Sequence, residues 1–298
     1  MVSSCFDKVI DMTNESRLGG VNRRRLLQAG ALLPLSGAMA WAQAQESDAL
    51  TRIRKRGSLI VAVYNAMPPF NVDGSGIDVK IAEQLALSLG VKLSLMPFNA
   101  GENMEDDLRN MVWKGHYLGF GPADVLLHVP VDKPLMDSQP QAQILAPYYR
   151  EVVSVAYRVE RFPKLESLAD LKDNKVAVAG QTLAGWLLIG ADGGAYREQL
   201  MTRMDDGTAA ARLLLSGEVA VAAGNASELH SVLKGDKQYR VIPMPIPRAP
   251  RNGWAVGMAV KKNSTDLARA LQATVNDMAK DQRMAQIFAE QGVPWGAA

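Results

Sequence analysis

Short apolar runs alternate with helical stripes along most of this 298-residue chain, and residues 59–90 show the pattern most clearly. Residues 59–63 form an apolar, β-branched run that predicts a buried strand. Pro68 and Pro69 end this strand and place Phe70 beyond its carboxyl end. Apolar residues then recur at a spacing of four, at Ile77, Ile81, Leu85 and Leu89, which predicts an amphipathic helix. Phe70 is therefore expected either in the core or against a small ligand outside the strand end.

The same alternation continues to the end of the chain. Further strands are predicted at residues 93–96, 124–129, 151–157, 175–179, 219–223, 240–244 and 254–260. Further helices are predicted at 106–113, 165–171, from about 184, and at 208–216, 227–233 and 266–291, the last as one long helix or a pair. Strands that alternate with helices indicate an α/β fold with largely parallel sheets.

The first 44 residues have the features of an export signal. Arg23, Arg24 and Arg25 precede a modest apolar run at 29–40, and two small-x-small sites follow, Ala38-Met39-Ala40 and Ala42-Gln43-Ala44. Basic, apolar and small-residue segments in this order predict a twin-arginine signal peptide over residues 1–44. The apolar run is too short to span a bilayer. We therefore expect a soluble periplasmic protein.

Removal of this leader changes the charge and the cysteine content. The leader holds five of the 33 basic and three of the 31 acidic side chains, so 28 of each remain. A near-neutral chain without clustered lysine and arginine argues against nucleic acid as a partner. Cys5, the single cysteine, is also removed, so we expect no disulfide, no thiolate nucleophile and no cysteine-based metal site.

Ordered motifs along the mature chain resemble those of family-3 periplasmic solute-binding proteins, the type that serves uptake of polar amino acids. The motifs are Leu50-x-x-Ile53-x-x-x-Gly57-x-Leu59, Pro68-Pro69-Phe70, Gly76-Ile77-Asp78-Val79, Ala123-Asp124-Val125, Ala146-Pro147-Tyr148-Tyr149, Trp254-Ala255-Val256, Asp266-Leu267 and Glu290-Gln291-Gly292. The resemblance implies the two-lobe α/β fold of type II periplasmic-binding proteins, with lobe one at 47–146 and 252–298 and lobe two at 150–246. Crossover segments at 147–149 and near 245–251 would act as hinges that let the lobes close on a ligand.

The residues that hold an amino acid in this family differ here. The resemblance places the arginine that clamps the α-carboxylate at Met136, and the aspartate that receives the α-ammonium at Asn225. The stacking aromatic corresponds to Met67. Each lost charged anchor removes about 1.5–3 kcal/mol of binding, so we expect that the protein does not bind standard amino acids in the usual manner. Lys133 is the residue that could replace the carboxylate anchor, as a point charge.

A narrower resemblance concerns Val129-Pro130 and the run Ala146-Pro147-Tyr148-Tyr149-Arg150. These residues are similar to those of solute-binding-like proteins encoded beside pyrroloquinoline-quinone (PQQ) alcohol dehydrogenases such as methanol dehydrogenase. That similarity implies an accessory protein that acts with the dehydrogenase. The segment 116–122, rich in glycine and aromatic residues, fits neither pattern and is expected to form an exposed loop over the cleft or on a partner surface.

The predicted ligand-binding residues lie near strand ends or helix starts. They are Tyr64, Met67, Phe70, His128, Asp132, Lys133, Gln181, Thr182 and Asn225. Gln181 and Thr182 begin a helix whose free amides suit an anion, although Thr182 can equally be a plain cap. No catalytic residue, cofactor or metal site is predicted, because His116, His128 and His230 form no close pair and the methionines occur at helical core spacing.

Three functions remain open. The first is a monomeric periplasmic binding protein that closes on a small polar solute and presents it to the membrane permease of an ABC transporter. The second is an accessory protein that docks on a periplasmic quinoprotein dehydrogenase or cytochrome, with a degenerate cleft. The third is a cyclohexadienyl-type dehydratase in which His128, Asp132 and Lys133 supply acid–base chemistry. We favour the first, a binding protein and not an enzyme.

Overall fold

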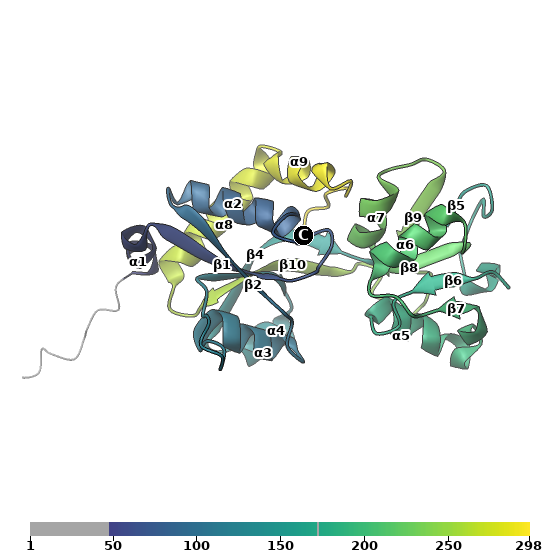
Figure 1. The fold of residues 1–298 in the computed structure, drawn as a ribbon, viewed down its shortest axis with the longest axis horizontal. Coiled ribbons are helices and arrows are strands. Elements are labelled where there is room, and N and C mark those ends of the chain that lie inside the picture. The colour runs from purple at the N-terminus through teal and green to yellow at the C-terminus, as the bar shows by residue number, and fades with distance from the viewer. Residues whose placement is uncertain (1–47, 172) are drawn as a thin grey trace, which may run out of the picture. The chain divides into compact units, whose positions relative to one another are not determined.

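Two five-stranded sheets organise the described part of the chain (Figure 1). The structure is a computed structural model that describes residues 48–171 and 173–298. The predicted signal peptide at 1–44, with Cys5, lies outside these residues. Among the helices of residues 48–171 and 173–298, none is long and apolar enough to cross a membrane.

The first sheet has the strand order β2-β1-β3-β10-β4. Its strands are β1 (Ser58–Tyr64), β2 (Lys92–Phe98), β3 (Val125–Pro130), β4 (Ala142–Glu151) and β10 (Trp254–Lys261). β1 pairs in parallel with β2 and β3, whereas β10 runs antiparallel to β3 and β4. The sheet thus joins early strands to a strand from near the C-terminus.

Helices cover both faces of the first sheet because alternate residues of a strand point to opposite sides. Leu59, Val61 and Val63 of β1 pack in a core with residues of four helices. These helices are α1 (Ala49–Arg56), α2 (Ile77–Ser88), α8 (Thr265–Lys280) and α9 (Arg283–Glu290). Ala62 and Tyr64 of the same strand pack in a second core with α3 (Met104–Leu108) and the π-helix Arg109–Trp113. One apolar run therefore contributes to two cores.

The second sheet has the strand order β7-β6-β8-β5-β9. Its strands are β5 (Val153–Arg158), β6 (Val176–Val178), β7 (Leu200–Met201), β8 (Val221–Asn225) and β9 (Tyr239–Pro243). α5 (Leu183–Gly190) packs in one of its cores, and α6 (Gly207–Ser216) and α7 (Ala226–Leu233) pack in the other. Short 3-10 helices occur at Leu168–Leu171, Ala191–Gly194 and Arg197–Gln199.

The predicted elements are largely confirmed, and α8 and α9 form the pair expected at 266–291. The expectation of largely parallel sheets holds for four of the five strands in each sheet, and the exceptions are β10 in the first sheet and β5 in the second, each antiparallel to both neighbours. Each of these two strands directly follows a segment that connects the two sheets, so neither follows a helix of a strand–helix–strand unit. β4, β7, α4 (Lys133–Ser138) and the N-terminal α1 were not predicted. β7, α4 and α1 are too short to show a clear periodicity, and β4 was missed because residues 147–149 were assigned to a crossover.

The chain passes between the sheets at a different place from the one expected. Residues 147–149 were expected to form the first crossover, but Tyr149 pairs with Val256 inside the first sheet. The strand expected at 151–157 is divided, since β4 ends at Glu151 and β5 begins at Val153. The first passage is therefore the short link between β4 and β5, and the second is the segment between β9 and β10.

Two leucines of α2 differ in burial and test which face of the helix packs in the first core. Leu85 is fully buried, whereas Leu87, two residues later on the same helix, is 70% exposed. We expect Leu85→Ala to lower the free energy of unfolding by about 2–5 kcal/mol, because it leaves a cavity in the core. Leu87→Ala should change it by no more than about 0.5 kcal/mol. Urea denaturation of both variants measures the difference, and equal effects would contradict the predicted packing of α2.

Candidate functional site

His128 lies at a β-bulge near the end of β3. Its two neighbours in the strand lie opposite Met258 and Gly257, which are consecutive residues of β10, so His128 is an extra residue in the ladder. The His128 backbone has a φ of 62°, a left-handed conformation that is unfavourable for a non-glycine residue. Its amide donates to the Tyr148 hydroxyl, at 3.1 Å. Bulges commonly reorient a side chain next to a functional site, and this one places the imidazole on the wall of a cavity.

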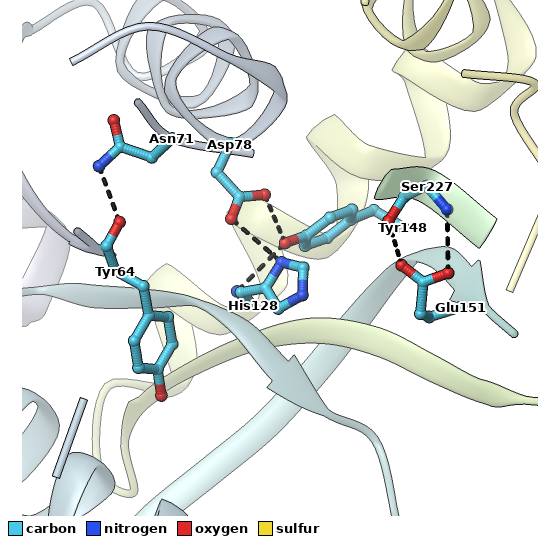
Figure 2. A network of polar contacts seen from close by, with 7 residues as sticks. All are labelled: Tyr64, Asn71, Asp78, His128, Tyr148, Glu151 and Ser227. Carbon is cyan, nitrogen blue, oxygen red and sulfur yellow. Dashed lines mark hydrogen bonds and ion pairs between the residues drawn. The ribbon is translucent and has the colours of Figure 1, made fainter. Parts of the chain in front are cut away.

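A buried carboxylate holds the His128 ring. Asp78 Oδ2 lies 3.2 Å from His128 Nδ1, and Asp78 Oδ1 accepts a hydrogen bond of 2.8 Å from the Tyr148 hydroxyl (Figure 2). Asp78 is 1% exposed, and a buried carboxylate is stable only where such donors replace its water. A proton on Nδ1 satisfies Asp78, which leaves Nε2 of His128 as the ring nitrogen available to a ligand.

The start of α2 positions Asp78. Gly76 precedes the helix with a φ of 138°, and a Cβ at this position would lie 2.4 Å from the Phe70 carbonyl oxygen. Glycine therefore permits the close approach of the loop to the helix. The Asp78 amide donates to the Phe70 carbonyl at 3.0 Å. As a result the Phe70 ring lies with its centroid 4.2 Å from that of His128, in an edge-on arrangement.

A second buried carboxylate, Glu151, connects the end of β4 to the start of α7. It accepts hydrogen bonds from the Ser227 hydroxyl and, at 3.3 Å, from the Ser227 amide (Figure 2). The Val152 amide adds a third donor at 3.0 Å. Burial raises the pKa of the Glu151 carboxyl, and the hydrogen bonds and the nearby His128 imidazole offset part of that rise. This contact joins the last residue of the first sheet's β4 to a helix of the second sheet.

A third carboxylate, Glu228, lies in the first turn of α7. It accepts a hydrogen bond of 2.8 Å from the Asn225 amide, as the acidic residue of a capping box does. Gly207 leaves room for it, because a Cβ there would lie 2.5 Å from Glu228 Oε2. Burial raises the pKa of Glu228 to about 7, and the negative charges of Glu151 and Asp206 add to the rise. Glu228 is therefore the carboxyl of this region whose charge changes near neutral pH.

These groups meet at one cavity of about 300 Å³. We call Tyr64, Met67, Phe70 and His128 its first wall, and Asp206, Asn225, Ser227 and Glu228 its second wall. Asn65, Ala66, Pro68 and Ala100 complete the lining. Its volume is at the low end of the range for small-molecule sites, about 300–1,000 Å³. The first wall lies at the ends of strands and the second at the starts of α6 and α7, where α/β folds bind ligands.

Five of the nine residues predicted to bind a ligand line this cavity. They are Tyr64, Met67, Phe70, His128 and Asn225. Tyr64 lines the cavity, while its ring packs beside Phe98 in the core that also contains α3, and its hydroxyl donates to Asp107 at 2.9 Å. The structure brings these five together, and their contact with a ligand stays a prediction.

The other four predicted residues lie outside the lining of this cavity. Asp132 caps α4, and Lys133 forms an ion pair of 2.7 Å with Asp137 on the same helix, with its side chain 83% exposed. Thr182 caps α5, and Gln181 is exposed beside it. These side chains lie at helix starts and have local roles there. For Thr182, a helix cap was the alternative that the sequence left open.

The acidic residues of the site were not among those predicted from the sequence. Asp206 and Glu228 line the cavity, and Asp78 and Glu151 are buried next to its walls. The spacing Asn225-x-x-Glu228 is a helix-start signal that could have placed Glu228. No local signal marks Glu151, because its burial depends on the distant start of α7.

The segment 116–122 forms an exposed loop outside the lining of the cavity. The His116 amide donates to the Phe120 carbonyl at 2.8 Å, and the two rings stack with centroids 4.3 Å apart. Tyr117 is 87% exposed at the tip. Within residues 48–171 and 173–298, no group of three or more histidine, cysteine, aspartate or glutamate side chains is placed to hold a metal ion.

The chain is similar to amino acid solute-binding proteins. No protein-family model matches it. The L-cystine-binding protein TcyJ of Escherichia coli (strain K12) is 23% identical over 271 residues, which cover 89% of this chain and 93% of TcyJ. A solved ancestral cationic amino acid solute-binding protein matches with a TM-score of 0.63 at 19% identity, over 82% of this chain and 99% of that one. The L-cystine solute receptor of Neisseria gonorrhoeae, in its unliganded open conformation, matches with a TM-score of 0.60 at 18% identity, over 84% and 99%.

These similarities show a type II periplasmic-binding-protein fold, so the predicted fold class is confirmed. The relatives support the wider resemblance to family-3 solute-binding proteins. They lend no support to the narrower resemblance to proteins associated with quinoprotein dehydrogenases.

The raised pKa of Glu228 predicts a specific dependence of stability on pH. The folded protein holds this proton up to about pH 7, whereas the unfolded chain releases it near the ordinary value of 4.5. The free energy of unfolding should therefore fall as the pH rises between these values, by up to about 3 kcal/mol from this group. The Glu228→Gln variant has no carboxyl to titrate at this position, so its free energy of unfolding should fall less as the pH rises.

Urea denaturation of both proteins at several pH values measures this difference. The exposed Glu218, replaced by glutamine, is the matched control and should keep the pH dependence of the original protein. Parallel curves for the original protein and Glu228→Gln would show that the Glu228 carboxyl is not perturbed.

Proposed function

We propose that this protein is a periplasmic solute-binding protein that delivers a small polar solute to the permease of an ABC transporter. The cavity carries the proposal, because side chains from the regions of both sheets line it at strand ends and helix starts. Its lining combines the apolar residues Met67 and Phe70 with polar residues such as Asn225, as sites for small molecules do. The relatives, named as solute-binding proteins, support the same function.

In this proposal two lobes hold the ligand between them. Lobe one comprises residues 47–146 and 252–298, and lobe two comprises residues 150–246. The separate strand orders of the two sheets support the division, and the two connecting segments are the natural hinges. Closure about these hinges would bring the first and second walls of the cavity onto the solute.

The location is part of the same proposal. The twin-arginine pattern before residue 45 would direct export, and the mature protein would act in the periplasm as a monomer. A membrane permease would then receive the solute from the closed protein.

The relatives bear on the choice of solute. TcyJ and the Neisseria receptor are named for L-cystine, and the ancestral protein is named for cationic amino acids. These names weigh against the expectation, drawn from Met136 and Asn225, that standard amino acids are excluded. The proposed function therefore covers small polar solutes with amino acids among them. The same relatives give no support to a dehydrogenase or cytochrome partner, or to a dehydratase activity.

A thermal-shift screen tests this function. A solute that binds only the folded protein raises its melting temperature, so we expect at least one member of a panel of amino acids, diamines, dicarboxylic acids and sugars to do so. Ala100 is exposed and lines the cavity, so Ala100→Trp should fill part of the space and weaken binding of that compound by at least about tenfold. Calorimetry measures the affinity.

The matched control for this variant is Ala195→Trp. Ala195 is also exposed, and it lies outside the lining of the cavity, so this variant should bind the compound as the original protein does. A panel without any stabilising compound, or an unchanged affinity in Ala100→Trp, would refute the assignment of the cavity as the ligand site.

A further inference from the structure

We propose that the cavity selects organic cations that lack a carboxylate, so that an amine binds more tightly than the amino acid with the same side chain. This inference rests on the proposed function, because it names the ligand class of the same cavity. The cavity makes the site, and the charges of its walls set which ligands it accepts.

The helix starts that would attract a carboxylate already hold the protein's own acids. At α6, Asp206 accepts a hydrogen bond of 2.8 Å from a backbone amide of the first turn. At α7, Glu151 accepts hydrogen bonds from the Ser227 amide and hydroxyl, and Glu228 accepts one from the N-cap amide. Helix starts bind anions through free amides, so filling them with carboxylates removes that capacity from the second wall.

The charges on the lining also favour a cation. In the described part of the chain, no lysine or arginine lines this cavity, whereas Asp206 and Glu228 do. His128 is the lining residue that can carry a positive charge, and it is already paired with Asp78. A ligand carboxylate would lose its water without gaining a charged partner. An ammonium or guanidinium group would instead form charge-assisted hydrogen bonds with Asp206 and, above about pH 7, with Glu228.

The first wall suits the rest of such a ligand. Tyr64 and Phe70 line this wall but are only 4% and 2% exposed, so they offer apolar surface against which an alkyl chain can pack. The rings of His128 and Tyr149 hold Phe70 in place, with centroid distances of 4.2 and 5.9 Å. Met67 adds a flexible apolar surface beside them. These contacts require no carboxylate on the ligand.

Two cationic residues line a neighbouring cavity of about 370 Å³. Arg212 and Lys234 belong to that cavity, which shares only Pro68 with the first. A long amino acid that entered both cavities could place its carboxylate near Arg212. Arg212 is therefore the residue that would make an amino acid bind more tightly than its amine.

Two matched pairs of compounds test the proposal with the purified protein. Agmatine differs from L-arginine, and cystamine from L-cystine, by the absence of the carboxylates alone. In at least one pair, calorimetry should give a dissociation constant for the amine at least about tenfold below that of its amino acid, since an unpaired carboxylate is removed. Amino acids that bind as tightly as their amines, or no binding of either amine, would overturn the proposal.

Different results would refute the proposed function and the preference for carboxylate-free cations. Tight binding of L-arginine or L-cystine without their amines would leave the proposed function standing and refute the preference for carboxylate-free cations. Loss of that amino acid binding in Arg212→Gln would locate the carboxylate in the neighbouring cavity and refute the preference as well. A solute panel without any stabilising compound would refute both.

Replacement of one lining acid separates the effect of charge from that of shape. Asp206→Asn removes a negative charge but keeps a side chain that caps helices well, so the fold should be retained. We expect it to weaken binding of the preferred amine by about tenfold. Asp236→Asn is the matched control, because Asp236 accepts an amide at 2.9 Å outside the lining, and it should bind the amine normally. Unchanged amine binding in Asp206→Asn would contradict the role of the acidic wall.

Discussion

Burial of the Glu151 carboxylate is the constraint on which the geometry of the cavity depends. A carboxylate without water must find donors, and Glu151 finds them in Ser227 and in the amide of Val152. Separation of β4 from the start of α7 would remove the Ser227 hydroxyl and amide from Glu151 and leave it the Val152 amide. The wall that carries His128 and the wall that carries Glu228 are therefore held beside the same small space.

Three of the four carboxylates at this cavity, Asp78, Glu151 and Glu228, are stabilised in different ways. Asp78 receives a hydroxyl and an imidazole, and Glu151 receives a hydroxyl and two amides. Glu228 receives backbone amides only, and burial together with the negative charges of Glu151 and Asp206 raises the pKa of its carboxyl to about 7. Of the three, Glu228 can change its charge in the neutral range without the loss of a side-chain partner.

The sequence predicted the features that depend on local periodicity. The run at 59–63, the stripe through Ile81 and Leu85 and the aromatic loop at Phe70 all have the positions expected, and Phe70 is both buried and on the wall of the cavity. The mixed direction of the strands and the acidic second wall could not be predicted in this way. Both follow from contacts between segments far apart in the chain, such as Glu151 with the start of α7.

The bulge at position 128 has a consequence for how such proteins diversify. The backbone amide of this residue bonds to the Tyr148 hydroxyl and not to a neighbouring strand, and its two neighbours keep the ladder intact. Exchange of the side chain therefore alters the chemistry that a solute meets while the sheet keeps its register. Glycine or asparagine there would relieve the backbone conformation, at the loss of the imidazole that pairs with the buried Asp78.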